Sequence, residues 1–170
     1  MSDFGETSAF FGLLLDREAA RAWREQLRAE GKRVVFTNGV FDVLHAGHVE
    51  YLAWARAQGD ALLVGLNEDA SVRALKGERR PIMPFEDRAR LLRALRSVDA
   101  VVGFSERTPE VLLDLVRPDI HVKSAQYRLD DLPERAVVLS YGGEIRLAPH
   151  AAGRSTTDLI ARIICRYTQS

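Results

Sequence analysis

The stretch that most constrains the fold of this chain is 34–52, VVFTNGVFDVLHAGHVEYL. It opens with an apolar run of β-branched and aromatic residues, which is typical of a buried strand. A polar Thr-Asn-Gly run ends that strand, and a helix is expected to begin near Gly47. A strand, a tight turn and a helix N-terminus form an anion site, because backbone N–H groups and the positive end of the helix dipole point the same way. The stretch therefore predicts a phosphate site that His45 and His48 face.

Short apolar runs alternate with helical patterns along the rest of the chain. Strands that alternate with helices form a parallel sheet covered on both faces. The sequence predicts an α/β fold, a Rossmann-like three-layer sandwich with a five-stranded parallel sheet. Residues 1–30 are expected to form an N-terminal tail and helix, and 31–170 a single domain. Strands are expected at 34–36, 61–66, 100–104, 120–123 and 144–147, and helices at 16–30, 47–58, 70–75, 85–98, 109–116, 132–141 and 156–167.

Polar clusters follow the expected strands. They occupy 37–48, 67–69, 123–127 and 150–156. In an open parallel sheet, ligands bind beyond the carboxyl ends of the strands, where the strand order reverses. The four clusters are therefore expected to converge on one rim.

Composition limits the classes of partner. Lys plus Arg and Asp plus Glu both number 24, so the formal charge is zero. This balance argues against a nucleic-acid partner and against an anionic membrane, and the short apolar segment at 9–15 is not a signal or membrane segment. The chain has a single cysteine, Cys165, which excludes a multi-cysteine zinc site. Cys165 lies in the last expected helix and is expected to face the hydrophobic core. A cytoplasmic location is expected.

The two histidines admit three interpretations. They could be partly exposed side chains at a helix start, or a metal pair, although no further ligand stands at zinc spacing. They could also donate hydrogen bonds to phosphoryl oxygens as charge builds in a transition state. The positions of the two histidines support the phosphate-binding interpretation, because His45, His48 and Leu52 share one helical face.

The stretch and several later segments resemble one known family. TNGVFD (37–42) and HAGH (45–48) are similar to the turn and H-x-G-H signature of the cytidylyltransferase-like nucleotidyltransferases. NEDASVRALKGERRPI, EDR, SVDAVVGF, TPEVL, RPDIHVK and GRSTTDLI resemble one branch, the D-glycero-β-D-manno-heptose 1-phosphate adenylyltransferases, which make ADP-heptose for lipopolysaccharide. The resemblance covers about 34–164.

The resemblance implies a role for each matching residue. The turn at 39–42 would hold the phosphates and ribose of ATP, the two histidines would stabilise the α- and β-phosphates, and two loop cations would close over them. Mg²⁺ is the implied cofactor, and related enzymes often form homodimers. The implied catalytic residues are His45, His48, Lys76 and Arg88. The implied nucleotide-binding residues are Thr37, Asn38, Gly39, Val40, Phe41, Asp42, His45, Gly47, His48, Arg80, Arg88, Gln126, Tyr127, Ser155 and Thr156.

Three of these residues can also be interpreted from pattern alone. Arg88 lies in the first turn of its helix on the core-facing stripe, so it should point into the crevice. Ser155 stands three residues before Asp158, close to a capping box, which would explain it without a ligand. Asp42 could close an Asx turn, contact the nucleotide or reach Mg²⁺ through water. No side chain is assigned as a direct metal ligand.

The sequence departs from this branch at one loop. The branch has Gly-Gly-Asp-Tyr after its Val-Lys, whereas this chain has Ser124-Ala125-Gln126-Tyr127. Since glycines let a backbone approach a ligand, the base and the acceptor stay open. The first expectation is AMP transfer from ATP to heptose 1-phosphate with release of pyrophosphate. The alternatives are a CTP-dependent cytidylyltransferase acting on glycerol 3-phosphate or a similar small phosphate, and a non-catalytic nucleotide-binding module.

Overall fold

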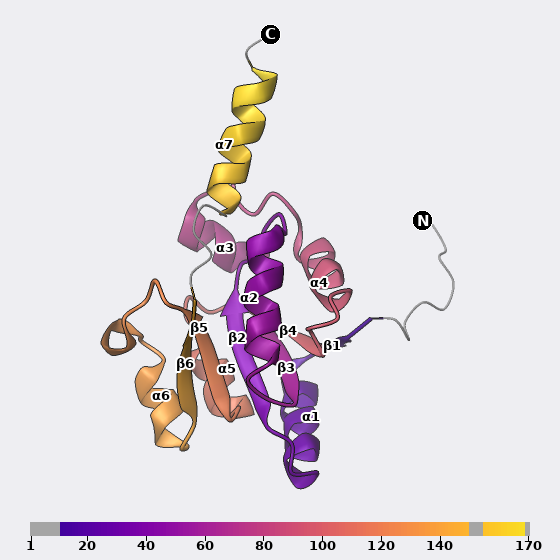
Figure 1. The fold of residues 1–170 in the computed structure, drawn as a ribbon, viewed down its shortest axis with the longest axis vertical. Coiled ribbons are helices and arrows are strands. Elements are labelled where there is room, and N and C mark those ends of the chain that lie inside the picture. Colours follow the sequence, from indigo (N-terminus) through magenta and orange to yellow (C-terminus); the bar gives the residue numbers. More distant parts are fainter. Residues whose placement is uncertain (1–10, 150–154, 169–170) are drawn as a thin grey trace.

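The computed structural model describes residues 11–149 and 155–168. Its centre is one sheet of six parallel strands in the order β1-β4-β3-β2-β5-β6 (Figure 1). The α/β, Rossmann-like prediction is confirmed, and the predicted strand number, five, is wrong. The strands are β1 (Leu13–Leu15), β2 (Val34–Gly39), β3 (Ala61–Asn67), β4 (Ala100–Phe104), β5 (Ile120–Ser124) and β6 (Glu144–Ala148).

Helices cover both faces of the sheet. Helices α2 and α4 pack on one face, and α1, α5 and α6 on the other. Neighbouring strand residues alternate between the two cores: Val35 packs with Leu52 and Leu92 on the α2 side, and Phe36 packs with Leu113 on the α5 side. The helices are α1 (Arg17–Ala29), α2 (Ala46–Arg56), α3 (Asp69–Lys76), α4 (Phe85–Arg93), α5 (Glu110–Val116), α6 (Arg135–Ser140) and α7 (Thr156–Tyr167), with a 3-10 turn at Leu129–Asp131.

The additional strand, β1, lies at the edge of the sheet. Leu13–Leu15 pairs in parallel with Ala100–Val102 of β4. It was not predicted, because three leucines after a glycine carry no alternation. Leu13 and Leu14 are 46% and 47% exposed, as residues of an edge strand often are. The expected N-terminal tail and helix thus contribute a strand and a covering helix to the same sheet. Residues 1–10 of that segment lie outside the described residues.

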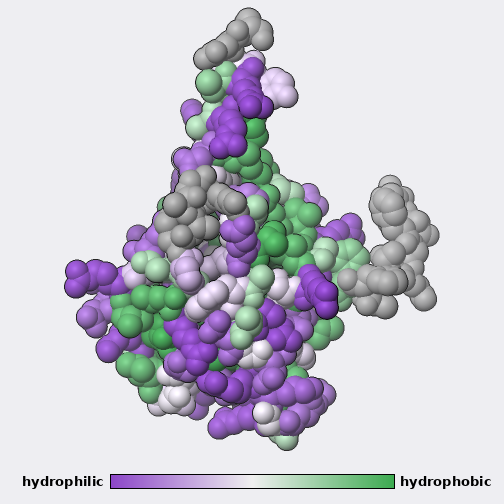
Figure 2. Space-filling view, in the orientation of Figure 1, coloured by the Kyte–Doolittle hydropathy of each residue, from purple (hydrophilic) through white to green (hydrophobic). Residues whose placement is uncertain are grey.

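The last helix departs from expectation most clearly. Figure 1 shows α7 projecting from the body, and Cys165, expected in the core, is exposed. Ile163 and Ile164 are also about half exposed, and Figure 2 shows apolar surface running from α7 down toward α4. None of the described residues of α7 is buried, so the described part of the chain packs little against this helix. None of the helices in 11–149 or 155–168 has the length and apolar character needed to cross a membrane.

The strand order shows where a ligand-binding crevice is expected in this sheet. The chain runs β2, β3, β4 outward on one side and then crosses to β5, which pairs with β2 through Val35 and Ile120. The order therefore reverses between β2 and β5, where open α/β sheets form a crevice at the carboxyl ends of the strands. These ends are Gly39 and Ser124.

Candidate functional site

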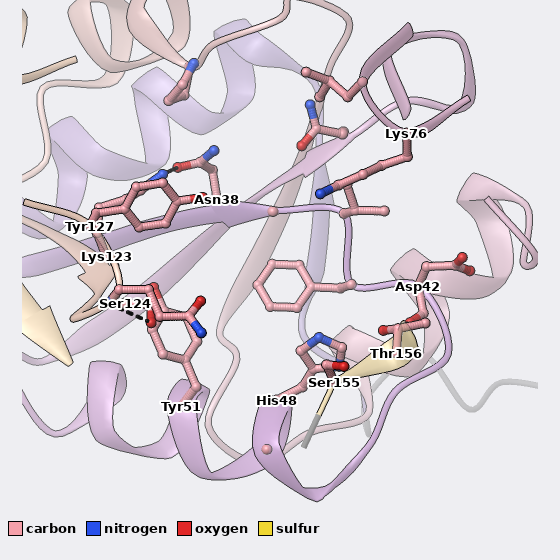
Figure 3. Close-up of a pocket in the computed structure, with 18 of the residues that line it drawn as sticks. Asn38, Asp42, His48, Tyr51, Lys76, Lys123, Ser124, Tyr127, Ser155 and Thr156 are labelled. Atoms are coloured by element: carbon pink, nitrogen blue, oxygen red, sulfur yellow. Dashed lines mark hydrogen bonds between the residues drawn. The ribbon is translucent and has the colours of Figure 1, made fainter. Parts of the chain in front are cut away.

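A pocket of about 890 Å³ opens at the carboxyl ends of β2 and β5 (Figure 3). The expected convergence of polar clusters on one rim is confirmed for the described residues, although His150 and Gly153 lie outside them. Most of the predicted site residues line the pocket: Asn38, Gly39, Val40, Phe41, Asp42, His45, Gly47, His48, Lys76, Arg80, Gln126, Tyr127, Ser155 and Thr156.

The two histidines stack at the start of α2. Their ring centroids lie 3.8 Å apart with an angle of 21° between the planes. Phe41 packs edge-on against His48, with the centroids 5.4 Å apart. Burial and the neighbouring His45 lower the pKa of His48 to about 4, so His48 is neutral near pH 7 and can offer a ring N–H to an anion.

The turn between β2 and α2 has a constrained backbone. Phe41 and Val43 have φ angles of 46° and 52°, in the left-handed region that side chains other than glycine rarely adopt. Such conformations persist only where the surroundings hold them. Two charged side chains, Asp42 and Arg88, do so here.

Asp42 ties the turn to the loop that follows α3. Its carboxylate is 3% exposed and accepts hydrogen bonds from Arg80 Nη1 at 2.6 Å and from the N–H groups of Ile82 and Met83 at 2.9 and 3.0 Å. Burial alone would raise the pKa of Asp42, but these N–H groups and the guanidinium outweigh it and lower the pKa. Both carboxylate oxygens are thus engaged within the protein.

Arg88 lies beneath the turn. Its side chain is fully buried and donates to the carbonyl oxygens of Val40 at 2.7 Å and Met83 at 3.0 Å, and to Asp69 Oδ1 at 2.6 Å. The sequence placed it on the inward stripe of α4, which its burial fits, but it does not point into the crevice as expected: neither Arg88 nor Thr37 lines the pocket. Its guanidinium supports the turn from behind. Thr37 is likewise buried, and its Oγ1 donates to the carbonyl of Val122 across the sheet at 3.0 Å.

The N-terminus of α7 closes another side of the pocket. Ser155 Oγ accepts from the N–H of Asp158 at 3.0 Å, which is the predicted cap. Thr156 Oγ1 donates to the carbonyl of Asp42 at 2.8 Å, so the helix start is attached to the turn. A helix N-terminus attracts anions, and Ser155 and Thr156 line the same pocket as His48 (Figure 3).

Several pocket residues were not predicted as site residues. Lys123 and Asn67 belong to flagged polar clusters, and Tyr51 follows His48 by three residues on α2, a spacing that could have identified it. Tyr51 Oη shares a 2.7 Å hydrogen bond with Thr37 Oγ1, and burial raises its pKa. The others are Glu50, Trp54, Leu75, Arg107, Thr108, Pro109, Ser124, Asp131, Leu132, Pro133, Glu134, Pro149 and Thr157.

The described residues contain no group of three or more histidine, cysteine or acidic side chains arranged to hold a metal ion. The carboxylate oxygens of Asp42 already accept hydrogen bonds from three donors, on Arg80, Ile82 and Met83. Magnesium commonly binds through substrate phosphates with only one or two protein carboxylates. The donor set therefore fits Mg²⁺ carried by a nucleotide rather than a protein-built cage.

Comparison with known proteins gives consistent relatives. The chain is 53% identical over 140 residues to "Bifunctional protein HldE" of Geobacter sulfurreducens, covering 82% of this chain and 29% of that protein. It is 50% identical over 153 residues to the same-named protein of Syntrophotalea carbinolica, covering 90% of this chain and 31% of that protein. The chain thus spans about three tenths of the length of these relatives.

Solved structures share the architecture. A lipopolysaccharide core biosynthesis protein from Thermoplasma volcanium matches with a TM-score of 0.59 and 26% identity, covering 71% of this chain and 98% of that one. A pantoate-beta-alanine ligase from Francisella tularensis matches with a TM-score of 0.56, covering 94% and 80%, and at 12% identity it shows the fold alone. The family model described as cytidylyltransferase-like matches residues 36–162, which include the rim from the carboxyl end of β2 to the start of α7. The chain belongs to the cytidylyltransferase-like family.

Proposed function

We propose that this protein is an adenylyltransferase that transfers AMP from ATP to a sugar 1-phosphate, heptose 1-phosphate first, with release of pyrophosphate. The observation that carries the proposal is that stacked histidine rings, a capped helix N-terminus and the cations Lys76 and Arg80 line one pocket. The relatives named HldE and the matched lipopolysaccharide core biosynthesis protein support the sugar branch.

The reaction breaks the bond between the α-phosphorus of ATP and its bridging oxygen. A phosphate oxygen of the acceptor forms a new bond to that phosphorus, and pyrophosphate leaves with the electron pair. The chain contributes positioning and charge stabilisation, because no covalent intermediate is required. His45 and His48 would donate to the α- and β-phosphates, and Lys76 would neutralise the leaving group. Mg²⁺ held on the nucleotide would supply further charge neutralisation.

Asp42 and Arg88 have supporting parts in this scheme. Arg80 reaches the pocket while bonded to Asp42, which keeps the loop after α3 against the turn. Arg88 fixes the Val40 carbonyl from behind. Both residues therefore act by holding the backbone beside the phosphates.

The test is a panel of nucleoside triphosphates against sugar 1-phosphates, followed as pyrophosphate release. ATP with heptose 1-phosphate should give the highest kcat/KM. CTP with glycerol 3-phosphate is the informative competitor, because Ser124 and Gln126 line the pocket where the related branch has glycine and aspartate. A higher kcat/KM for that pair would overturn the adenylyl assignment.

His48→Ala should lower kcat by roughly 10²–10³, the usual cost of removing one preorganised donor to a developing charge. Val49→Ala is the matched control, because Val49 is the next residue on α2 and is 43% exposed. Both variants are measured at saturating ATP. If His48→Ala retained turnover within a few-fold of Val49→Ala, the role proposed for His48 would be wrong.

A further inference from the structure

Lys123, at the end of β5, belongs to a buried ionic cluster on the side of the pocket away from the α3 loop. Its Nζ lies 3.0 Å from Glu134 Oε1 and 3.3 Å from Asn38 Oδ1, and 4.9 Å from the centroid of the Tyr127 ring. The same Glu134 oxygen lies 3.1 Å from Nε2 of His121. The three ionisable side chains are 12%, 2% and 0% exposed, respectively for Lys123, Glu134 and His121.

Two side chains of this cluster, Glu134 and His121, have shifted pKa values. Burial alone would raise the pKa of Glu134, but hydrogen bonding to His121 and the charge of Lys123 lower it to about 2. Burial lowers the pKa of His121. His121 is therefore a neutral donor to an ionised Glu134, and the carboxylate is shared with the ammonium of Lys123.

A purely structural role explains this cluster poorly. Taking charged groups out of water costs free energy, and apolar side chains of similar volume often stabilise a core equally well or better. The cluster also does not end inside the protein, because Lys123, Glu134 and Asn38 all line the pocket. Its geometry holds one ammonium at the pocket wall and fixes its direction.

The proposed reaction needs two anions in one pocket. Lys76, Arg80, the histidines and the start of α7 face the nucleotide phosphates, and Figure 3 shows Lys76 and Lys123 on opposite sides of the pocket. We propose that Lys123 binds the phosphate of the acceptor, and that Glu134 and His121 are its positioning residues. This assignment rests on the proposed nucleotidyl transfer.

The first test compares steady-state constants. Lys123→Met keeps the length and apolar stem of the side chain and removes the ammonium. It should raise the KM for heptose 1-phosphate about 10- to 100-fold, as expected for one lost charge-assisted hydrogen bond, and leave the KM for ATP within about threefold. Glu134→Gln should shift the same constant in the same direction by less, because its amide oxygen still accepts from Lys123 but carries no charge.

Lys32→Met is the matched control, because Lys32 is half exposed and pairs with Glu30 away from the pocket. A rise in the KM for ATP equal to that for the acceptor, or no change in either constant, would overturn the assignment. A merely structural cluster would lower the melting temperature without separating the two KM values.

The second test uses the unmodified chain, so it does not depend on the variants folding. Proton–nitrogen NMR spectra of the lysine ammonium groups are recorded with heptose 1-phosphate, with glucose 1-phosphate and with ATP. The Lys123 signal should move with a sugar 1-phosphate and stay in place with ATP alone. If that signal moves but no pyrophosphate forms, the proposed reaction fails and the phosphate site stands. If pyrophosphate forms and the signal stays fixed, the site fails and the reaction stands.

Discussion

His48 lies with its ring against that of His45, and burial together with this neighbour lowers the pKa of His48. The ring of His48 is therefore neutral in the free protein near pH 7 and can donate a hydrogen bond when a phosphate binds. The same arrangement makes protonation of His48 unfavourable in the folded state. Stability should therefore depend on pH in a defined window.

His48 has a folded-state pKa of about 4, below the ordinary value of 6.5. Below pH 6.5 the unfolded chain takes up a proton that the folded chain resists, so stability is greatest above pH 6.5 and is lost as the pH falls toward 4. Urea unfolding of the wild type and of His48→Asn at pH 8, 6.5, 5 and 4 checks this. The difference between the two curves isolates His48 from the carboxylates. Parallel pH profiles would contradict the prediction.

Asp42 joins three segments that are distant in sequence: the turn, the loop after α3 and, through its carbonyl, the start of α7. Asp42→Asn should cost about 1.5–3 kcal/mol of unfolding free energy, since it weakens a buried charge-assisted hydrogen bond, and should raise the KM for ATP because the loop carrying Arg80 is released. Asp87→Asn, at an exposed carboxylate of α4, is the control in urea unfolding. Equal urea midpoints for the two variants would show that the hydrogen bonds of Asp42 do not contribute to the unfolding free energy.

At the scale of elements, the start of α7 combines a helix cap with a phosphate site, and Ser155 could be there for either reason. Ser155→Asn and Ser155→Asp both retain capping ability, but only aspartate adds a negative charge beside the phosphates. Amide exchange at 156–160 should be unchanged in Ser155→Asn and somewhat faster in Ser155→Asp, because Ser155 Oγ donates to Asp158 Oδ2 at 2.8 Å and a carboxylate there repels Asp158. ATP affinity by calorimetry should fall at least tenfold in Ser155→Asp alone. Equal affinities would mean that Ser155 serves only the helix.

The elements that the sequence predicted well are those whose signal is local. The apolar run before Thr37 and the histidines identify β2 and α2, and parallel pairing then brings the rim together. The expected strand end at Thr37 is wrong, because β2 continues through Gly39 and pairs with β3 up to that residue. Local patterns do not show tertiary partners. The ion pair of Lys123 with Glu134 joins the end of β5 to the residue before α6, and the bond from Arg88 to the Val40 carbonyl joins α4 to the turn. Neither follows from periodicity.

Element ends were less accurate for the same reason. Helix α4 was expected to run to Val98 but ends at Arg93. The Arg93 carbonyl accepts from the N–H of Gly12 at 2.8 Å, and Arg93 Nε donates to the Gly12 carbonyl at 2.6 Å. That contact brings Gly12 beside β4 and lets Leu13 begin the edge strand. A strand of three residues is too short to show a periodic pattern in the sequence, and its position depends on contacts with β4 and Arg93.

On the scale of the whole molecule, β1 and the pocket lie far apart in the sheet. The order places β4 and β3 between β1 and β2, so the edge should affect stability more than catalysis. Removing residues 1–15 should cost about 3 kcal/mol, from the lost ladder hydrogen bonds and the exposure of β4. It should leave the KM for ATP unchanged at temperatures where the protein stays folded.

Removing only residues 1–10 gives the control, because β1 and the Gly12 contacts with Arg93 are kept. The longer deletion turns β4 into an unprotected edge, and edge strands of that kind pair with other chains. Light scattering should therefore report aggregation for the longer deletion and not for the shorter one. If the longer deletion lowered kcat/KM at temperatures well below its melting temperature, the sheet edge and the pocket would be coupled through β4 and β3. The expectation that β1 affects stability and not catalysis would then be wrong.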